Sequence, residues 1–290
     1  MGPYVTVFYT QMLLFSIFFF YVAIMPRYAR VCDALAQKKE HNMNLRYITM
    51  SDPGEDLDIE ETLDLLSVSP LAELGVQAYP SAMMYGLPRY VWFNKLLDAV
   101  ENLKEQPNIA LHVNFHWCDD MCNNVVPNQI RGWLDRKNKK TEKPLIKRIQ
   151  LNIGDSAYVF RAHKVHDLIA RFPDREFILP YNKRVASKID SLHATNAKFN
   201  LLFDESYGAG IAAKSYDVPP YNDVNSGYAG GLSPENVIDR LGKINQILPA
   251  DYSTWIDAEG QLRGCFGSMA LNRARAYLDN ALRWCKQHTK

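Results

Sequence analysis

The sequence predicts an α/β protein in which eight strands and their helices close into a (βα)8 barrel. Strand-like and helix-like segments alternate with short loops from about Asn44 onward, a pattern typical of a parallel sheet. Eight such units fall within residues 44–290, which suits a closed barrel better than an open doubly wound sheet. No GxGxxG motif follows the first expected strand, so a dinucleotide-binding fold is not indicated.

Each expected strand is a short apolar run that ends in polar residues. In chain order these strands are Arg46–Ser51, Leu74–Tyr79, Ile109–Phe115, Ile149–Ile153, Glu176–Pro180, Phe199–Asp204, Ser226–Ala229 and Thr254–Asp257. The expected helices are Ile59–Leu66, Trp92–Leu103, Gln129–Arg136, Ala162–Ala170, Ala186–Leu192, Pro234–Ile244 and Leu271–Trp284, with the helix after the sixth strand unassigned. The basic stretch Arg136–Lys147 is expected to be a loop within the barrel.

Composition limits the classes of partner. The formal net charge is +1, and no basic run is interleaved with aromatic residues, so nucleic acid is not expected as a partner. The five cysteines are odd in number and unevenly spread, which does not suggest a disulfide framework. A reducing compartment, and hence a cytoplasmic location, is the simpler expectation.

The N-terminal region is the part that does not fit a barrel. Residues 4–25 contain no charged side chain and are long enough to cross a bilayer. The first positive charges, Arg27 and Arg30, follow this stretch, so insertion would leave the rest of the chain in the cytoplasm. The alternative is a dispensable extension, because Met25 and Met43 could each start a chain. We therefore expect residues 1–43 to be a hydrophobic extension or membrane anchor and residues 44–290 to be the barrel.

Polar residues at the strand ends are the candidates for chemistry, because barrels of this kind react at the carboxyl ends of their strands. Asp204 ends the sixth expected strand. Gly230 and Gly231 connect the seventh strand to the start of a helix, where free N–H groups suit an anion. Together they predict proton transfer and anion binding at one mouth.

Several motifs occur in a characteristic order: GVQAYP at 75–80, LPRYV at 87–91, IQLNIGD at 149–155, LLFD at 201–204 and YAGGLSPENV at 228–237. This set resembles phosphoribosylanthranilate isomerase from about Asn44 to the C-terminus. The resemblance implies a (βα)8 TIM barrel of the ribulose-phosphate-binding type, here with the hydrophobic N-terminal extension. It also implies an Amadori rearrangement of a small phosphorylated sugar adduct, a step of tryptophan biosynthesis, and we expect no cofactor and no metal.

The resemblance assigns roles by position. It implies that Asp204 is the general acid that protonates the ribose ring oxygen, and that Arg89 holds the anthranilate carboxylate. Gly230 and Gly231 match the glycines that receive the phosphate. Remaining expected substrate contacts are Gln150 and Asn152 of the fourth-strand motif and, in the loop after the eighth strand, Gly260 at the phosphate.

The first and eighth strands depart from the family pattern. The family carries a catalytic cysteine in strand one, whereas here Thr49 falls closest to that position, and a threonine hydroxyl is a poor base. Asp52 could replace it if the loop bends inward. After strand eight, Asp257 and Glu259 would repel a phosphate unless they turn away or pair with Lys183, Arg184 or Arg263.

Two histidines and two cysteines raise the question of a metal. His112 and His116 are expected on one face of the third strand, and Cys118 and Cys122 are spaced more widely than the CxxC of common zinc sites. No second pair occurs, so no metal is expected, and His116 is instead a candidate proton-transfer or substrate-binding residue.

Two other functions remain open at this point. One is a lyase or aldolase that uses Lys183, at the tip of the fifth strand, as a Schiff-base amine. The other is a barrel that binds a ligand without catalysis, which the missing cysteine motivates. The observation that separates them from an isomerase is whether a basic group lies across the mouth from Asp204.

Overall fold

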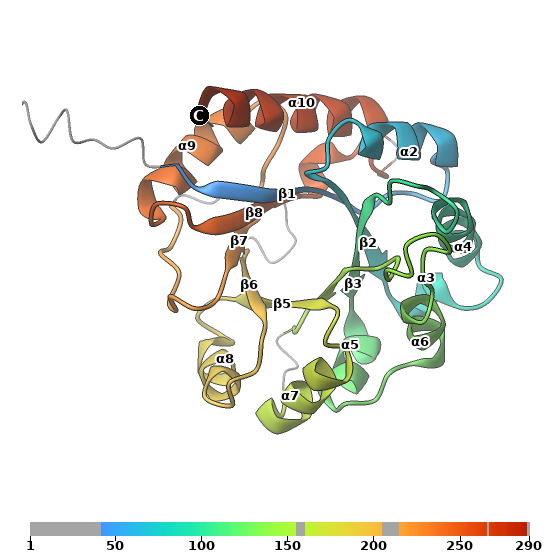
Figure 1. The fold of residues 1–290 in the computed structure, drawn as a ribbon, viewed down its shortest axis with the longest axis horizontal. Helices are drawn as coiled ribbons and strands as arrows, with labels where there is room; N and C mark the ends of the chain where they lie inside the picture. The colour runs from blue at the N-terminus through green and yellow to red at the C-terminus, as the bar shows by residue number, and fades with distance from the viewer. Residues whose placement is uncertain (1–41, 155–159, 205–214, 266, 289–290) are drawn as a thin grey trace, which may run out of the picture. The chain divides into compact units, whose positions relative to one another are not determined.

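The computed structural model describes residues 42–154, 160–204, 215–265 and 267–288. Residues from Asn42 onward form one compact unit. Within it, eight parallel strands form a closed barrel in the order β1 to β8, and β1 pairs with β8 to complete the circle (Figure 1). The predicted (βα)8 barrel is therefore confirmed.

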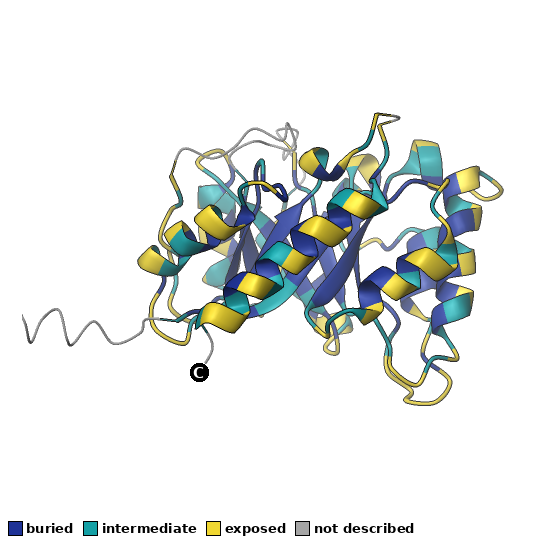
Figure 2. Ribbon diagram, turned by 90° about the horizontal axis from the view of Figure 1, so that it is seen from above, coloured by how far each residue is buried: buried dark blue, intermediate teal, exposed yellow. Residues whose placement is uncertain are grey.

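The strands are short and follow the predicted order. They are β1 (Asn44–Ser51), β2 (Ala72–Ala78), β3 (Asn108–Val113), β4 (Arg148–Leu151), β5 (Glu176–Tyr181), β6 (Asn200–Phe203), β7 (Ser226–Tyr228) and β8 (Ser253–Ala258). Most strand residues are buried on both faces, as expected for a parallel sheet that is covered by helices outside and filled by side chains inside (Figure 2).

The helices surround the barrel and alternate with the strands (Figure 1). The described helices are α2 (Ile59–Ser67), α3 (Pro80–Met83), α4 (Pro88–Val100), α5 (Phe115–Cys122), α6 (Asn128–Leu134), α7 (Ala162–Arg171), α8 (Ala186–His193), α9 (Val237–Ile247), the 3-10 turn η2 (Gly260–Leu262) and α10 (Leu271–His288). Figure 2 shows that they expose one face to solvent and bury the other.

Local sequence signals explain where these helices begin. The side chain of Asp58 caps α2 by accepting a hydrogen bond from the N–H of Glu61 at 3.0 Å. Helix α4 begins with Pro88, whose missing N–H costs nothing in the first turn. The long helix α10 buries Ala274, Tyr277, Leu278, Ala281 and Trp284, which repeat at spacings of three and four residues.

The region after the third strand differs from the prediction. We expected the strand to continue to Phe115, but β3 ends at Val113, and Phe115–Cys122 form the helix α5. Trp117, Cys118, Met121 and Cys122 are its buried residues, and their spacing is helical. Packing of this face therefore overrides the apparent alternation of polar residues that suggested a longer strand.

The barrel interior holds a buried ion pair below the mouth. Arg148 of β4 donates to the carboxylate of Glu73 of β2 at 2.6 Å, and both side chains are at most 1% exposed. The guanidinium also lies 4.3 Å from the ring centre of Tyr47 and 4.4 Å from that of Trp255. Burial raises the pKa of Glu73, while Arg148 opposes this shift. This pair and its two rings fill the space beneath the cavity described below.

The predicted membrane segment at residues 4–25 lies outside the described residues. In the part of the chain that the structure describes, no helix has both the length and the apolar character required to cross a membrane.

Candidate active site

A cavity of about 740 Å³ opens at the carboxyl ends of the strands, and every one of the eight strands contributes to it directly or through the loop that follows. Its lining is rich in amides and carboxyl groups and includes one arginine, Arg263. Burial of polar side chains at this end of a (βα)8 barrel is the usual setting for catalysis.

The structure brings together most of the site residues expected from the sequence. Asp52, Gln150, Asn152, Asp204, Gly230, Gly231 and Gly260 all line this cavity. Thr49, Arg89, His116 and Lys183 do not belong to its described lining. Each of these four has an identifiable place elsewhere, apart from the cavity.

Thr49 lies inside the barrel but below the mouth. Its side chain is buried, and its hydroxyl donates to Glu73 at 2.8 Å. His116 and Lys183 are exposed, the first on α5 and the second in the loop after β5. The expectation that His112 and His116 share a strand face is wrong, because β3 ends before His116 and only His112 faces the cavity.

Arg89 is bound by other residues of the chain and is not directed into the cavity. Its guanidinium forms an ion pair with Asp52 and donates to the carbonyl of Pro53 at 3.0 Å, so the side chain is only 9% exposed. Asp52 follows β1 with a φ of 65°, a left-handed conformation that is uncommon for a residue other than glycine. The turn thus directs the Asp52 carboxylate toward both Arg89 and the cavity.

A second arginine continues this network across the mouth. Arg263 lies 3.0 Å from Asp52 and 2.7 Å from Glu259. Glu259 also accepts from the amide of Gln77 at 3.0 Å. The carboxyl groups of Asp52 and Glu259 are therefore both paired with guanidinium groups. The partner of Glu259 is Arg263, one of the three basic residues considered from the sequence. Burial, with the charge of Asp52, raises the pKa of Glu259.

The amides form a chain of hydrogen bonds that begins at Gln77, the partner of Glu259. Asn114 donates to Gln77 at 2.7 Å, Asn152 donates to Asn114 at 2.9 Å, and Gln150 donates to Asn152 at 2.7 Å. These side chains come from β2, β3 and β4 and the residues just after them. Each fixes the orientation of the next, so the wall presents amide groups in defined positions to a polar ligand.

Asp257 of β8 occupies the floor of the cavity and was absent from the residues proposed for catalysis. It is 7% exposed and accepts a hydrogen bond from the hydroxyl of Ser51 at 2.6 Å. Burial raises the pKa of Asp257 to about 8, against the effect of the Ser51 hydrogen bond. At neutral pH this carboxyl group is mostly protonated, which reduces the negative charge of the mouth.

Gly75 makes room for this floor. A Cβ atom at Gly75 would meet the hydroxyl of Ser51 and would lie 2.7 Å from Cε1 of His112. His112 is buried, and desolvation together with the charge of Arg148 lowers its pKa to about 3. The imidazole is therefore neutral and serves as a polar, uncharged part of the cavity wall.

The glycine turn after β7 lies beside Asp204, since β6 and β7 are neighbours in the barrel. Gly230 and Gly231 have φ values of 92° and 62°, and Asn236 holds the turn by donating to the carbonyl of Gly231 at 2.8 Å. Among the described residues, the N–H groups of Gly230, Gly231 and Leu232 have no hydrogen-bond partner. These N–H groups can donate hydrogen bonds to an anion at the start of the segment that leads into α9.

The structure gives no support to a metal centre in its described part. No group of three or more His, Cys, Asp or Glu side chains there has an arrangement that could hold a metal ion. Cys118 and Cys122 are buried on α5 as free thiols.

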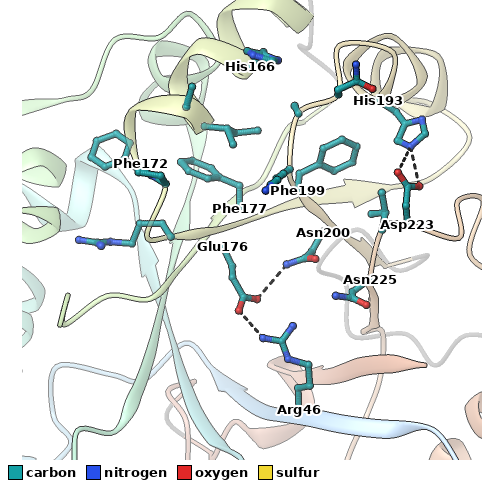
Figure 3. A pocket seen from close by; sticks show the side chains of 18 residues that line it. Arg46, His166, Phe172, Glu176, Phe177, His193, Phe199, Asn200, Asp223 and Asn225 are labelled. Carbon is teal, nitrogen blue, oxygen red and sulfur yellow. Dashed lines mark hydrogen bonds and ion pairs between the residues drawn. The ribbon is translucent and has the colours of Figure 1, made fainter. Parts of the chain in front are cut away.

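A second cavity, of about 770 Å³, involves α7, α8 and the amino ends of β5 and β6 (Figure 3). Glu176 pairs with Arg46 at 2.6 Å in this cavity, and His193 lies 3.1 Å from Asp223. Phe172, Phe177 and Phe199 also line this cavity. Because chemistry in a (βα)8 barrel is located at the carboxyl ends of the strands, the first cavity is the better candidate.

Asp257 and the amide wall could have been found from the sequence only in part. Alternation along β8 places Trp255 and Asp257 on one side of the strand, so an inward carboxyl group was detectable. The hydrogen bond to Ser51 joins residues 206 positions apart and depends on β1 lying next to β8. No local motif carries that information.

Comparisons with known proteins agree with the architecture. No protein-family model and no curated protein sequence matches the chain. Phosphoribosyl anthranilate isomerase from Thermotoga maritima is similar in structure, with a TM-score of 0.51 and 14% identity over 82% of this chain and 100% of that one. Monomeric variants of that dimeric enzyme give a TM-score of 0.46 at 15% identity, covering 82% of this chain and 100% of theirs. A putative spore coat polysaccharide biosynthesis protein E from Chromobacterium violaceum also gives 0.46, at 10% identity over 85% of this chain and 76% of its own. The chain therefore has a TIM-barrel fold like that of phosphoribosylanthranilate isomerase.

Proposed function

We propose that this barrel is an aldose–ketose isomerase that performs an Amadori-type rearrangement on a small phosphorylated sugar adduct. Asp204 acts as the general acid that protonates the ring oxygen, and the turn at Gly230 and Gly231 receives the phosphate. The observation that carries the proposal is that this acid and this turn line one cavity at the carboxyl ends of neighbouring strands.

The amide wall supports a polyhydroxylated substrate. Gln77, Asn114, Gln150 and Asn152 offer donors and acceptors that are held in place by their own hydrogen bonds. Amide groups bind sugar hydroxyls without adding charge, because each provides both a donor and an acceptor. A cavity of about 740 Å³ accommodates a ligand of this size.

The charges of the mouth are consistent with a phosphate on the glycine side. Asp52 and Glu259 are paired with Arg263, and Asp257 is mostly protonated at neutral pH. The repulsion that five carboxyl groups would exert is therefore much reduced, and the unpartnered N–H groups offer the remaining attraction.

The Schiff-base alternative lacks comparable support. Lys183 is exposed and is not among the residues that line the cavity. A lyase of this kind needs its amine in contact with the substrate carbonyl. The binding barrel without catalysis is separated from the isomerase by the experiment below.

Turnover of phosphoribosyl anthranilate by the full chain, followed by the loss of anthranilate-type fluorescence, tests the reaction. We expect turnover, and we expect Asp204→Asn to reduce kcat by about 100-fold or more while binding is retained. Asp64→Asn, on the exposed face of α2, is the matched control. Binding without turnover would favour the non-catalytic barrel, and full activity of Asp204→Asn would refute the assigned acid.

Phosphate binding is tested by thermal shift. Millimolar inorganic phosphate should raise Tm, and Gly231→Asp should abolish the shift because a carboxylate would occupy the anion position. Gly242→Asp adds the same charge on α9, where a side chain meets nothing within 4 Å, and should leave the shift intact. A shift that survives in Gly231→Asp would place the phosphate elsewhere.

A further inference from the structure

An aldose–ketose isomerisation requires a base as well as an acid, because a proton must leave the carbon next to the carbonyl carbon. Thr49, the residue of β1 closest to the expected base, points to Glu73 and does not line the cavity. The residue that lies beside Thr49 in the sheet does line the cavity. Asp257 of β8 is the register partner of Thr49 across the β1–β8 pair.

The geometry around Asp257 suits a group that must be oriented. Ser51 and Thr49 lie two residues apart on β1, and the Ser51 hydroxyl donates to Oδ1 of Asp257 at 2.6 Å. Oδ2 has no hydrogen-bond partner among the described residues, and it keeps some accessible surface in the cavity that Asp257 lines. One oxygen is thus held and the other is available to a ligand.

We propose that Asp257, positioned by Ser51, is the catalytic base of this barrel and supplies from β8 the proton acceptor that β1 does not provide. This assignment rests on the proposed function. Asp204, which directly follows β6, and Asp257 of β8 belong to the two strands that flank β7, so the acid and the base approach the substrate from different directions.

The proton balance of the step is complete with these two groups. The carboxyl group of Asp204 gives its proton to the ring oxygen as the bond from that oxygen to C1 breaks, and the nitrogen lone pair forms the C1=N double bond of an open-chain iminium ion. The carboxylate of Asp257 takes the proton from C2, the C2–H electron pair forms the C1=C2 double bond of the enolamine, and the π-electron pair of the C1=N bond returns to nitrogen while the C1–N single bond stays intact. Asp257 ends protonated and Asp204 ionised, and exchange with solvent restores both.

The surroundings of Asp257 make it a stronger base than an ordinary aspartate. Burial raises its pKa to about 8, which is close to the range of a cysteine thiol. The titratable groups that influence it are Glu259 just after β8, Glu73 of β2, Asp204 just after β6 and, on the outer side, Tyr277 of α10. A base with a pKa near the working pH combines a useful ionised fraction with a strong tendency to take a proton.

The test is the pH dependence of turnover of phosphoribosyl anthranilate by wild type and by variants at the floor of the cavity. In the wild type we expect kcat/KM to rise with pH, to reach half of its maximum near pH 8 and to level off only above that pH. Asp257→Asn should lower kcat by 100-fold or more with substrate binding retained, and Asp257→Cys should recover part of that loss because a thiol ionises in the same range. Ser51→Ala, which removes a hydrogen bond that favours the carboxylate, should move the rising limb to higher pH.

The controls separate this assignment from the proposed function. Asp64→Asn should match the wild type, and circular dichroism should show that each variant is folded. An inactive wild type would overturn the proposed function and the assignment with it. An active wild type together with a fully active Asp257→Asn would overturn the assignment alone. An unchanged pH profile in Ser51→Ala would refute the positioning role of Ser51.

Discussion

Replacing Asp257 with asparagine should change how the stability of the barrel depends on pH, independently of any substrate. The ordinary pKa of the group is 3.8, and burial raises it to about 8 in the folded protein. A carboxyl group whose pKa is raised by folding holds its proton more tightly in the folded state. Its contribution to stability is therefore fully present below about pH 4 and is lost as the pH rises toward 8.

The size of the effect follows from the pKa difference. One pKa unit corresponds to about 1.4 kcal/mol, so the three units between the ordinary value and pH 7 set an upper limit of about 4 kcal/mol. Relaxation around a charged Asp257 lowers this figure, and we expect about 2–4 kcal/mol. Asparagine does not ionise, so the stability of Asp257→Asn relative to the wild type should rise by this amount between pH 4 and pH 7.

Urea unfolding of both proteins at unit intervals from pH 4 to pH 9 measures the difference. The buried Trp255 in the barrel interior provides a fluorescence signal. The amide oxygen of asparagine also accepts from the Ser51 hydroxyl, so a change in the strength of this hydrogen bond adds only an offset that does not vary with pH, and Asp64→Asn on α2 should show no slope. A flat difference between Asp257→Asn and the wild type would refute the raised pKa and the reasoning built on it.

Two further predictions concern the barrel interior. Arg148→Met alone should destabilise the protein by about 3–5 kcal/mol in urea unfolding, because it leaves the buried Glu73 without its charged partner. The double variant with Glu73→Leu should recover most of that loss. Equal destabilisation by the single and double variants would contradict this explanation. Gly75→Ala should cost about 1–3 kcal/mol and impair turnover, because its methyl group meets Ser51 and His112. Gly132→Ala in α6, where a side chain meets nothing within 4 Å, should instead be neutral or stabilising by up to about 1 kcal/mol, and a similar loss at both positions would rule out the steric explanation.

The architecture was predictable because each βα unit carries its own signal. Runs such as Leu201–Phe203 are apolar on both faces, and helix starts such as Asp58 and Pro88 are marked locally. The error at α5 has a physical cause. Polar residues alternate through His112, Asn114 and His116, but the buried face that includes Trp117 and Met121 determines the conformation from Phe115 onward.

The candidate site was predictable in its location and less so in its contacts. Asp204 and the glycine turn follow strands, and the fold alone brings their positions to one end. The engagement of Arg89 by Asp52 depends on a left-handed turn after β1, which no sequence motif marked. Asp257 was visible as a carboxyl group at a strand end, but its partner and its raised pKa arise from burial between β1 and β8.

The ion pair between Glu73 and Arg148 has a consequence for how the barrel assembles. Both residues belong to the first four strands, yet Trp255 of β8 lies over the guanidinium, so the last strand completes the burial of the pair. A partly assembled sheet that lacks β8 would keep a charged, hydrated inner face and would bury little apolar area against a second copy. The charged interior thus discourages half-barrels from associating with one another and favours closure by the chain's own last strand.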